Sequence, residues 1–203
     1  MLPLLTPWFI HAALDAAGSA ERLGISASET YALSDRSVEE LVVGPGTFLL
    51  AGPDGRPFYD AAERGHLSDA RTLLGIFLLA GGLGILLVGI VMVRVAASRP
   101  QVWRTIARAG LVTAVTVVVL GLVSLVAFDS LFTLFHQVFF PGGNWSFDPG
   151  TQRLVQLYPF GFWQIAAAAL GLLVFLLGVG AWLLGRWAAT RSGSVPTPGR
   201  EEG

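Results

Sequence analysis

Two of the three histidines, His66 and His136, stand just beyond the ends of two long apolar runs and are the side chains best suited to chemistry. Imidazole takes up or releases a proton near neutral pH, so a histidine can act as a general base or a general acid. The chain has no cysteine, which excludes a thiol nucleophile and a Cys-ligated zinc site. No Gly-x-Ser-x-Gly motif surrounds Ser68 or Ser130. These patterns favour proton transfer by a histidine pair.

Carboxylates accompany both histidines. Glu63, His66 and Asp69 are spaced i, i+3 and i+6, so on a helix at least two of them can face one cavity. Asp129 and His136 share one side of a predicted helical extension, opposite a stripe of phenylalanines. Four acids are candidates to orient an imidazole or raise its basicity: Glu63, Asp69, Asp129 and Asp148.

A metal site is an alternative use of the same residues. Glu63, His66 and Asp69 together with His136 offer nitrogen and oxygen ligands of the kind that zinc accepts. The spacing differs from the H-E-x-x-H pattern of metalloprotease helices. We therefore predict no metal and no cofactor. His11 is interpreted as an interfacial residue without a catalytic role.

The histidines must be positioned by membrane helices. The chain has 203 residues, 53% hydrophobic and only 13% charged, with a mean hydropathy of +0.64. A soluble domain usually carries about 25% charged residues. Three apolar runs reach the roughly 20 residues that a helix needs to cross a bilayer, and a span of this kind must be helical. The predicted transmembrane helices cover 72–97, 109–128 and 160–187.

The arginines predict the orientation. The loop 98–108 and the tail 188–203 carry arginines, which places both in the cytoplasm by the positive-inside rule. The tail is rich in Pro, Gly and Ser and is predicted to be disordered. Segments 15–71 and 129–159 then lie outside, so both histidines fall at one depth on the extracytoplasmic face. A net charge of −1 gives no basic excess for a nucleic-acid partner.

Residues 15–71 are too many for a bare loop and predict a small extracytoplasmic cap. Ser26 and Glu29 have capping-box spacing and open a short helix. Ser34 and Asp35 precede a second short helix that ends at Val43.

Two further features bound the cap. A hairpin is expected around Pro53–Gly55, and Asp60 and Glu63 start a helix that continues into the first span. Segment 1–14 is apolar but too short to span a bilayer, and we interpret it as the end of a truncated first transmembrane helix. The segment 129–159 is predicted to extend the second span and then to fold over the outer end as a loop.

These residues resemble a known family of small bacterial membrane proteins, the lipoprotein intramolecular transacylases. The resemblance rests on Phe135-His136, on Trp145-Ser-Phe-Asp-Pro149 and on Leu154-Val-Gln-Leu-Tyr-Pro159. Upstream, the segment Glu63 to Arg71 resembles the family's acid–His–Asp sequence leading into a span, and Asp35 to Leu41 resembles its short outer helix. The resemblance covers roughly residues 8 to 187.

The resemblance implies a four-helix membrane fold in the bacterial plasma membrane, with an outer cap. It implies that an acyl chain moves from the glyceryl ester of a diacylglyceryl lipoprotein to that lipoprotein's own N-terminal cysteine amine, giving the lyso form. The family's two outer histidines fall on His66 and His136. In this hypothesis one histidine frees the amine and the other protonates the leaving glyceryl oxygen or stabilises the oxyanion. Three further residues are expected to support the site: Arg71, Asn144 and Trp145.

Two other functions compete with this one. A non-catalytic membrane protein would use the outer cap to bind a partner, and would tolerate replacement of both histidines. A metal-dependent intramembrane hydrolase would use the carboxylates and histidines as ligands.

Overall fold

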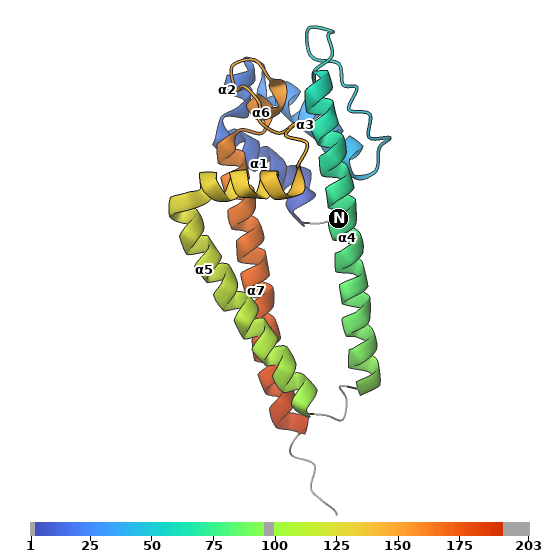
Figure 1. Cartoon of the computed structure of the whole chain (residues 1–203), viewed down its shortest axis with the longest axis vertical. Helices are drawn as coiled ribbons and strands as arrows, with labels where there is room; N and C mark the ends of the chain where they lie inside the picture. The colour runs from blue at the N-terminus through green and yellow to red at the C-terminus, as the bar shows by residue number, and fades with distance from the viewer. Residues whose placement is uncertain (1–2, 96–99, 193–203) are drawn as a thin grey trace, which may run out of the picture. The chain divides into compact units, whose positions relative to one another are not determined.

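The structure is a computed structural model that describes residues 3–95 and 100–192. These residues form helices joined by loops, without a regular strand, and confirm the all-helical fold class (Figure 1). The shorter elements are η1 (Pro3–Leu5), α1 (Pro7–Ala17), α2 (Ser19–Leu23), α3 (Ala27–Val42) and α6 (Arg153–Leu157). The long helices are α4 (Ala61–Val95), α5 (Pro100–Phe139) and α7 (Phe160–Ser192).

Helices α4, α5 and α7 are long and apolar enough to cross a membrane, which confirms the three predicted membrane helices. Their ends differ from the prediction. Helix α5 already begins at Pro100, within the segment predicted as a loop, and α7 continues to Ser192. Residues 96–99 and the tail from 193 lie outside the described residues. Helix α1 runs to Ala17, and whether 1–14 ends a further span stays a prediction.

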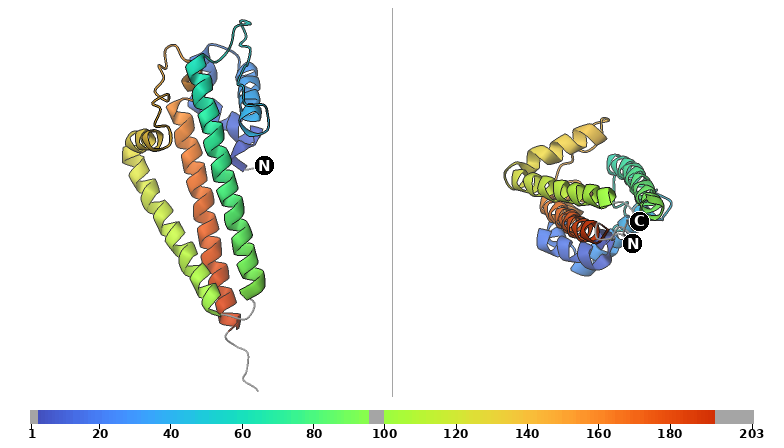
Figure 2. Two further views of the ribbon diagram at one scale, coloured as in Figure 1. Left: turned by 45° about the vertical axis from the view of Figure 1, so that its right-hand side comes forward. Right: turned by 90° about the horizontal axis from the view of Figure 1, so that it is seen from below.

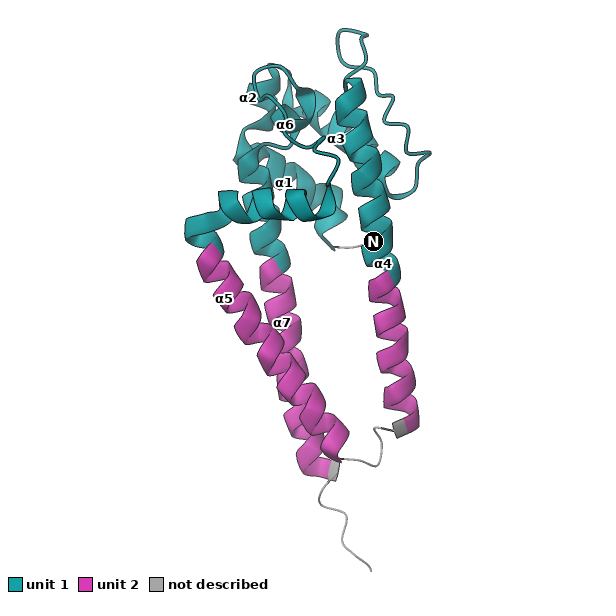
Figure 3. Cartoon of the chain, viewed as in Figure 1, with its two compact units in different colours: residues 1–79, 124–170 teal, residues 80–123, 171–203 magenta. Residues whose placement is uncertain are grey.

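The chain divides into two compact units (Figure 3). Unit 1 comprises residues 1–79 and 124–170, which hold the cap, the upper turns of α4 and α7, and the last part of α5. Unit 2 comprises 80–123 and 171–203, the other parts of the three long helices. Both predicted catalytic histidines belong to unit 1.

The cap is built from α1, α2, α3 and the loop that follows α3. Helices α1 and α2 both end at glycines in the left-handed region, Gly18 at φ 70° and Gly24 at φ 67°, which allows two sharp turns in close succession. The predicted capping box is present at Ser26, whose side chain accepts from the Glu29 N–H while the Glu29 carboxylate accepts from the Ser26 N–H.

The prediction of two short helices after Ser26 was wrong, because α3 is continuous. Ser34 was interpreted as the start of a second helix, but it lies fully buried within α3 and its hydroxyl hydrogen-bonds the Tyr158 hydroxyl at 3.0 Å. Ser37 donates back to the Leu33 carbonyl and lies 2.8 Å from the Tyr59 hydroxyl. A serine tolerates a helix interior when its hydroxyl has such partners.

Ser34 and Ser37 border the hydrophobic core of unit 1. Tyr59, Phe48, Leu14 and Leu157 are almost completely buried, and they come from α1, the post-α3 loop and α6. Burial raises the pKa of Tyr158 to about 12 and raises that of Tyr59 well above its ordinary value, so both hydroxyls stay protonated. The predicted hairpin is reduced to one antiparallel bridge between Ala51 and Pro57.

In unit 2, α5 and α7 pack closely against each other, side by side in Figures 1 and 2. The contact is made at glycines. A Cβ placed on Gly178 would lie 2.9 Å from the Gly110 carbonyl oxygen, and one on Gly185 would lie 2.7 Å from the Trp103 carbonyl oxygen. Small residues let helix backbones approach in a membrane, where van der Waals contact takes over the role of hydrophobic burial.

We expect Gly178→Ala to weaken this helix pair. The added methyl group meets backbone atoms that cannot yield, and such overpacking costs about 1–3 kcal/mol. Gly180→Ala is the matched control, because a Cβ at Gly180 meets no atom within 4 Å. Thermal unfolding in detergent should show a lower midpoint for Gly178→Ala and an unchanged or higher midpoint for Gly180→Ala. Equal midpoints for the two variants would contradict the packing described here.

Candidate active site

His66 and His136 come together in unit 1, although 70 positions separate them in the sequence. Their ring centroids lie 5.8 Å apart with an interplanar angle of 26°. His66 lies on the second turn of α4, and His136 lies near the C-terminal end of α5. Coulomb repulsion between two imidazolium ions at this separation opposes the doubly protonated pair. The arrangement therefore disfavours protonation of both rings at the same time.

Aromatic rings enclose the pair. Phe140 contacts both histidines, at 4.5 Å from His66 and 5.4 Å from His136 between ring centroids. Phe147 lies 5.5 Å from His66, and Trp145 lies 5.1 Å from His136. His136 is only 8% exposed. Weak hydration of this kind strengthens electrostatic interactions within the site.

The backbone fixes the orientation of His136. Its Nδ1 lies 2.7 Å from the Phe132 carbonyl oxygen, one helical turn earlier. A carbonyl oxygen only accepts, so Nδ1 must carry the hydrogen and donate it. In the neutral ring, Nε2 then holds the free lone pair. His136 is thus presented as a base with one defined reactive nitrogen.

The sequence analysis placed His136 on the side of this helix opposite the phenylalanines, and the position of Phe132 shows that this separation was wrong. Its ring lies 4.2 Å from the His136 ring, because residues i and i+4 are neighbours on a helix. Ala127 interrupts the regular backbone of α5 at φ −134° and ψ 26°. Beyond it, Phe128 and Phe132 pack edge-on against Phe160 at 5.2 and 5.6 Å and hold this part of α5 in place.

Two buried polar atoms at the site have no hydrogen-bond partner among the described residues. They are Nδ1 of His66 and Oδ1 of Asn144. The Asn144 amide is oriented by Asp69, whose Oδ2 accepts from Nδ2 at 2.8 Å. The amide oxygen therefore points away from the carboxylate as an unused acceptor. Buried groups without partners cost about 1–3 kcal/mol each, and a ligand with N–H donors would satisfy them.

Glu63 supports the site from one turn away. Its carboxylate accepts from the Asp60 N–H at 2.7 Å and from the Leu154 N–H at 2.7 Å, and its own N–H donates to Asp60. The predicted capping box at the start of α4 is therefore present. The same carboxylate also joins α4 to α6. Only 1% of Glu63 is exposed, so its contacts are structural and it does not hydrogen-bond an imidazole.

The remaining predicted supporting residues divide into near and remote ones. Trp145 forms part of the aromatic wall. Arg71 donates to the Glu40 carbonyl at the end of α3 and packs against Gly46, so it fastens the cap to α4. Asp148 is exposed and closes a turn by accepting from the Gly150 N–H and the Thr151 hydroxyl. The side chain of Asp129 is exposed and has no hydrogen bond within the described residues.

The sequence analysis missed Phe140 and Phe147, which contact His66. Both flank the Pro-Gly-Gly turn that follows α5, and the turn brings them back toward α4. An aromatic residue on each side of such a turn is the signal that could have identified them.

The ligands that we considered for a metal do not converge. Among residues 3–95 and 100–192, no group of three His, Asp or Glu side chains is arranged to hold a metal ion. The carboxylates of Glu63 and Asp69 are engaged by Leu154 and Asn144 instead. Of the considered set, the fold brings the two histidines together, and Asp69 lies beside them through its bond to Asn144.

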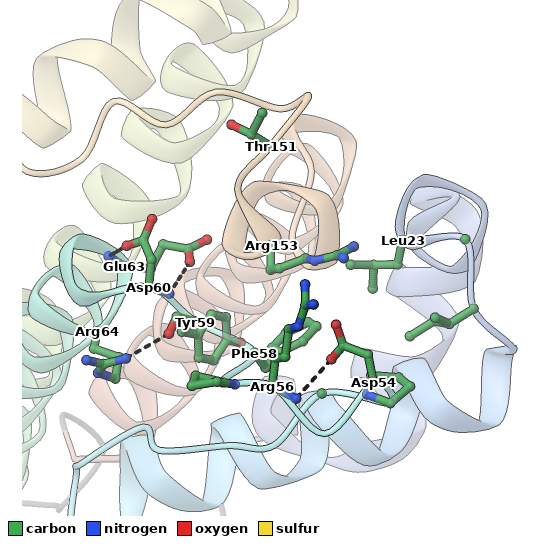
Figure 4. Close-up of a pocket in the computed structure, with 15 residues that line it drawn as sticks. Leu23, Asp54, Arg56, Phe58, Tyr59, Asp60, Glu63, Arg64, Thr151 and Arg153 are labelled. Atoms are coloured by element: carbon green, nitrogen blue, oxygen red, sulfur yellow. Dashed lines mark hydrogen bonds between the residues drawn. The ribbon is translucent and has the colours of Figure 1, made fainter.

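A cavity of about 730 Å³ opens in the cap beside the start of α4 (Figure 4). Its lining combines apolar residues, among them Leu23 and Phe58, with charged residues of both signs: Arg56, Arg64, Arg153, Asp54, Asp60 and Glu63. Arg64 donates to the Tyr59 carbonyl at 2.8 Å. His66 and His136 are not among its lining residues, so the cavity and the histidine pair are separate features of unit 1.

Glu63→Ala is expected to lower the stability of unit 1 by about 2 kcal/mol, because it leaves the buried Leu154 N–H and the partly buried Asp60 N–H without an acceptor. Glu29→Ala is the matched control, since Glu29 also completes a capping box but is exposed and contacts no other element. Thermal unfolding in detergent should give a clearly larger decrease for Glu63→Ala. Similar decreases in the unfolding midpoint for the two variants would show that the contact between α4 and α6 does not contribute to the stability of unit 1.

The sequence model of the family described as lipoprotein intramolecular transacylase matches residues 33–163, more than half of the chain. The match includes both histidines, Asn144 and most of α3 and α6. Neither a curated protein nor a solved structure matches the chain. The chain therefore belongs to the lipoprotein intramolecular transacylase family.

Proposed function

We propose that the chain moves an acyl chain within a diacylglyceryl lipoprotein, from the glyceryl ester to the amine of the N-terminal cysteine, giving the lyso form. The observation that carries this proposal is the pair formed by His66 and His136 inside an aromatic enclosure. Family membership supports a lipoprotein substrate in a membrane. No enzyme nucleophile is required, because the amine of the substrate is the nucleophile.

The proton balance of this transfer suits two histidines. The amine nitrogen attacks the ester carbonyl carbon, and Nε2 of His136 accepts the proton that the amine loses. The bond between the carbonyl carbon and the glyceryl oxygen then breaks, and His66 delivers a proton to that oxygen. An amide and a free hydroxyl result. The proton that His66 delivers is the one that His136 accepts and passes on, which the proximity of the two rings favours, so both rings are neutral before and after the reaction.

Asn144 provides a second element of recognition. Its Oδ1 is a buried acceptor without a donor, and Asp69 holds the amide in that orientation. An amine that enters the site supplies N–H donors to this oxygen. This contact would position the nucleophile at the ester, which is the main contribution that an enzyme can make to an intramolecular transfer. Asn144 is therefore proposed to bind the amine rather than the ester carbonyl.

The proposed setting is the bacterial plasma membrane. The arginine distribution supports a cytoplasmic C-terminus and a histidine pair on the extracytoplasmic face, where it would meet membrane lipid and the lipidated N-terminus of the substrate. The cap cavity has both apolar and charged lining residues, and we propose that it accommodates the polypeptide that follows the modified cysteine.

The first test is N-acylation of a reporter lipoprotein in a bacterium that lacks its own N-acylating enzyme. Mass spectrometry with fragmentation of the N-terminal lipopeptide locates each acyl chain. The wild-type chain should produce the N-acyl, monoacylglyceryl form, and His66→Ala or His136→Ala should abolish it. His11→Ala is the matched control, because His11 stacks on Tyr31 and pairs with Asp35 in the cap. Unchanged lipopeptide with wild-type protein present in the membrane would reject the proposed reaction and favour a non-catalytic role.

Asn144→Ala should slow N-acylation by about 10- to 100-fold, since a hydrogen bond to a charged group contributes about 1.5–3 kcal/mol. Gln152→Ala is the control for this loop, because its amide also donates to a carboxylate, that of Asp60, but it does not contact the histidines. The rate of acyl transfer in detergent or vesicles provides the measurement. Equal rates for wild type and Asn144→Ala would exclude the assigned role in amine binding.

A further inference from the structure

We infer that the arginine-rich end of α5 and α7 holds a binding site for the phosphate headgroup of an anionic phospholipid. The site is a cavity of about 320 Å³ that lies entirely within unit 2. We name it the basic cavity. It is lined by Arg104, Ala107, Arg108, Leu111, Trp182, Arg186, Ala189 and Thr190. This site is separate from the histidine pair and does not depend on the proposed acyl transfer.

Close helix packing creates the basic cavity. Gly185 lies against the backbone of α5, where a Cβ would meet the Ala107 nitrogen at 2.7 Å. This contact brings Arg186 of α7 beside Arg104 and Arg108, which lie one turn apart on α5 and therefore on one face. The three guanidinium groups are thus gathered by the backbone contact and are not attracted by a protein carboxylate.

No acidic residue of these helices neutralises the three arginines. The sequence has no Asp or Glu between Asp69 and Asp129, and none between Asp148 and Glu201. Like charges at i and i+4 repel each other, and a third cation adds to this cost. Within the described residues the cavity therefore carries a charge of one sign, which favours the binding of an anion.

The depth of the cavity favours a lipid. Arg108 comes directly before the apolar run of α5, and Arg186 directly follows that of α7. Arginines at the ends of spans lie at the level of the headgroups, and basic pockets between membrane helices bind anionic headgroups. Leu111 lines the apolar side of the cavity and is 46% exposed, so an acyl chain can continue along it from the phosphate.

Trp182 adds a fixed element to the site. The guanidinium carbon of Arg186 lies 5.2 Å from the Trp182 ring centroid, within the range of a cation–π contact. This contact orients the guanidinium group toward the cavity before a ligand arrives. Arginine donors arranged in this way form paired hydrogen bonds with phosphate oxygens.

Native mass spectrometry of the full chain in detergent tests the inference. Dioleoyl phosphatidylglycerol and dioleoyl phosphatidylcholine are titrated separately, so that only the headgroup charge differs. Phosphatidylglycerol should bind more tightly, and each of Arg104→Gln, Arg108→Gln and Arg186→Gln should weaken its binding about fivefold, following the contribution of one arginine near an anionic lipid. Phosphatidylcholine binding should stay unchanged.

Arg94→Gln is the matched control, because Arg94 ends α4 in the same unit but does not line the basic cavity. Equal affinity for the two lipids, or an equal loss in Arg94→Gln and Arg108→Gln, would overturn the inference. Inorganic phosphate is titrated as a third ligand. If it binds as tightly as phosphatidylglycerol and depends on the same arginines, the occupant is a free phosphate and the lipid assignment is wrong. The single substitutions preserve Gly185 and its backbone contact, so folding of the helix pair is not at risk.

Discussion

The buried carboxylate of Glu63 is the contact on which the geometry of unit 1 depends. It caps the first turn of α4 and accepts the Leu154 N–H, so it joins the N-terminal end of α4 to α6. His66 lies one turn further along α4, and Phe147 belongs to the loop that leads into α6. A displacement at Glu63 would move the histidine and its aromatic wall relative to each other. The contact between α4 and α6 is therefore part of the support of the site.

The histidine pair illustrates how a membrane protein can prepare a base without a neighbouring carboxylate. Serine hydrolases orient their histidine with an aspartate, whereas His136 is oriented by the Phe132 carbonyl of its own helix. The carbonyl oxygen carries no formal charge. It therefore fixes the hydrogen on Nδ1 of His136, but it stabilises a protonated imidazole less than a carboxylate would. The surrounding phenylalanine and tryptophan rings disfavour charge as well. Such a site suits a reaction in which a proton arrives and leaves within one turnover.

Features determined by local pattern could be predicted from the sequence, whereas features determined by tertiary contacts could not. The three apolar helices and both capping boxes follow from hydropathy and from the spacing of Ser26, Glu29, Asp60 and Glu63. The continuity of α3 does not, because the buried hydroxyl partner of Ser34 is a tyrosine 124 positions away. The proximity of the histidines was inferred from their equal predicted depth in the membrane. That depth does not indicate which acidic side chains face them. Glu63 and Asp129 share the expected helices with the histidines, yet Glu63 binds backbone N–H groups and Asp129 remains exposed.

The unpaired acceptors at the site restrict what can bind there. A group that stabilises an oxyanion must donate a hydrogen bond, whereas Oδ1 of Asn144 can only accept one. The Asp69 carboxylate prevents a flip of the amide, because the flipped state would place two acceptor oxygens against each other. The orientation of Asn144 thus selects a hydrogen-bond donor as its ligand. The proposed ester aminolysis supplies such a donor, because the attacking amine carries N–H groups that this oxygen can accept.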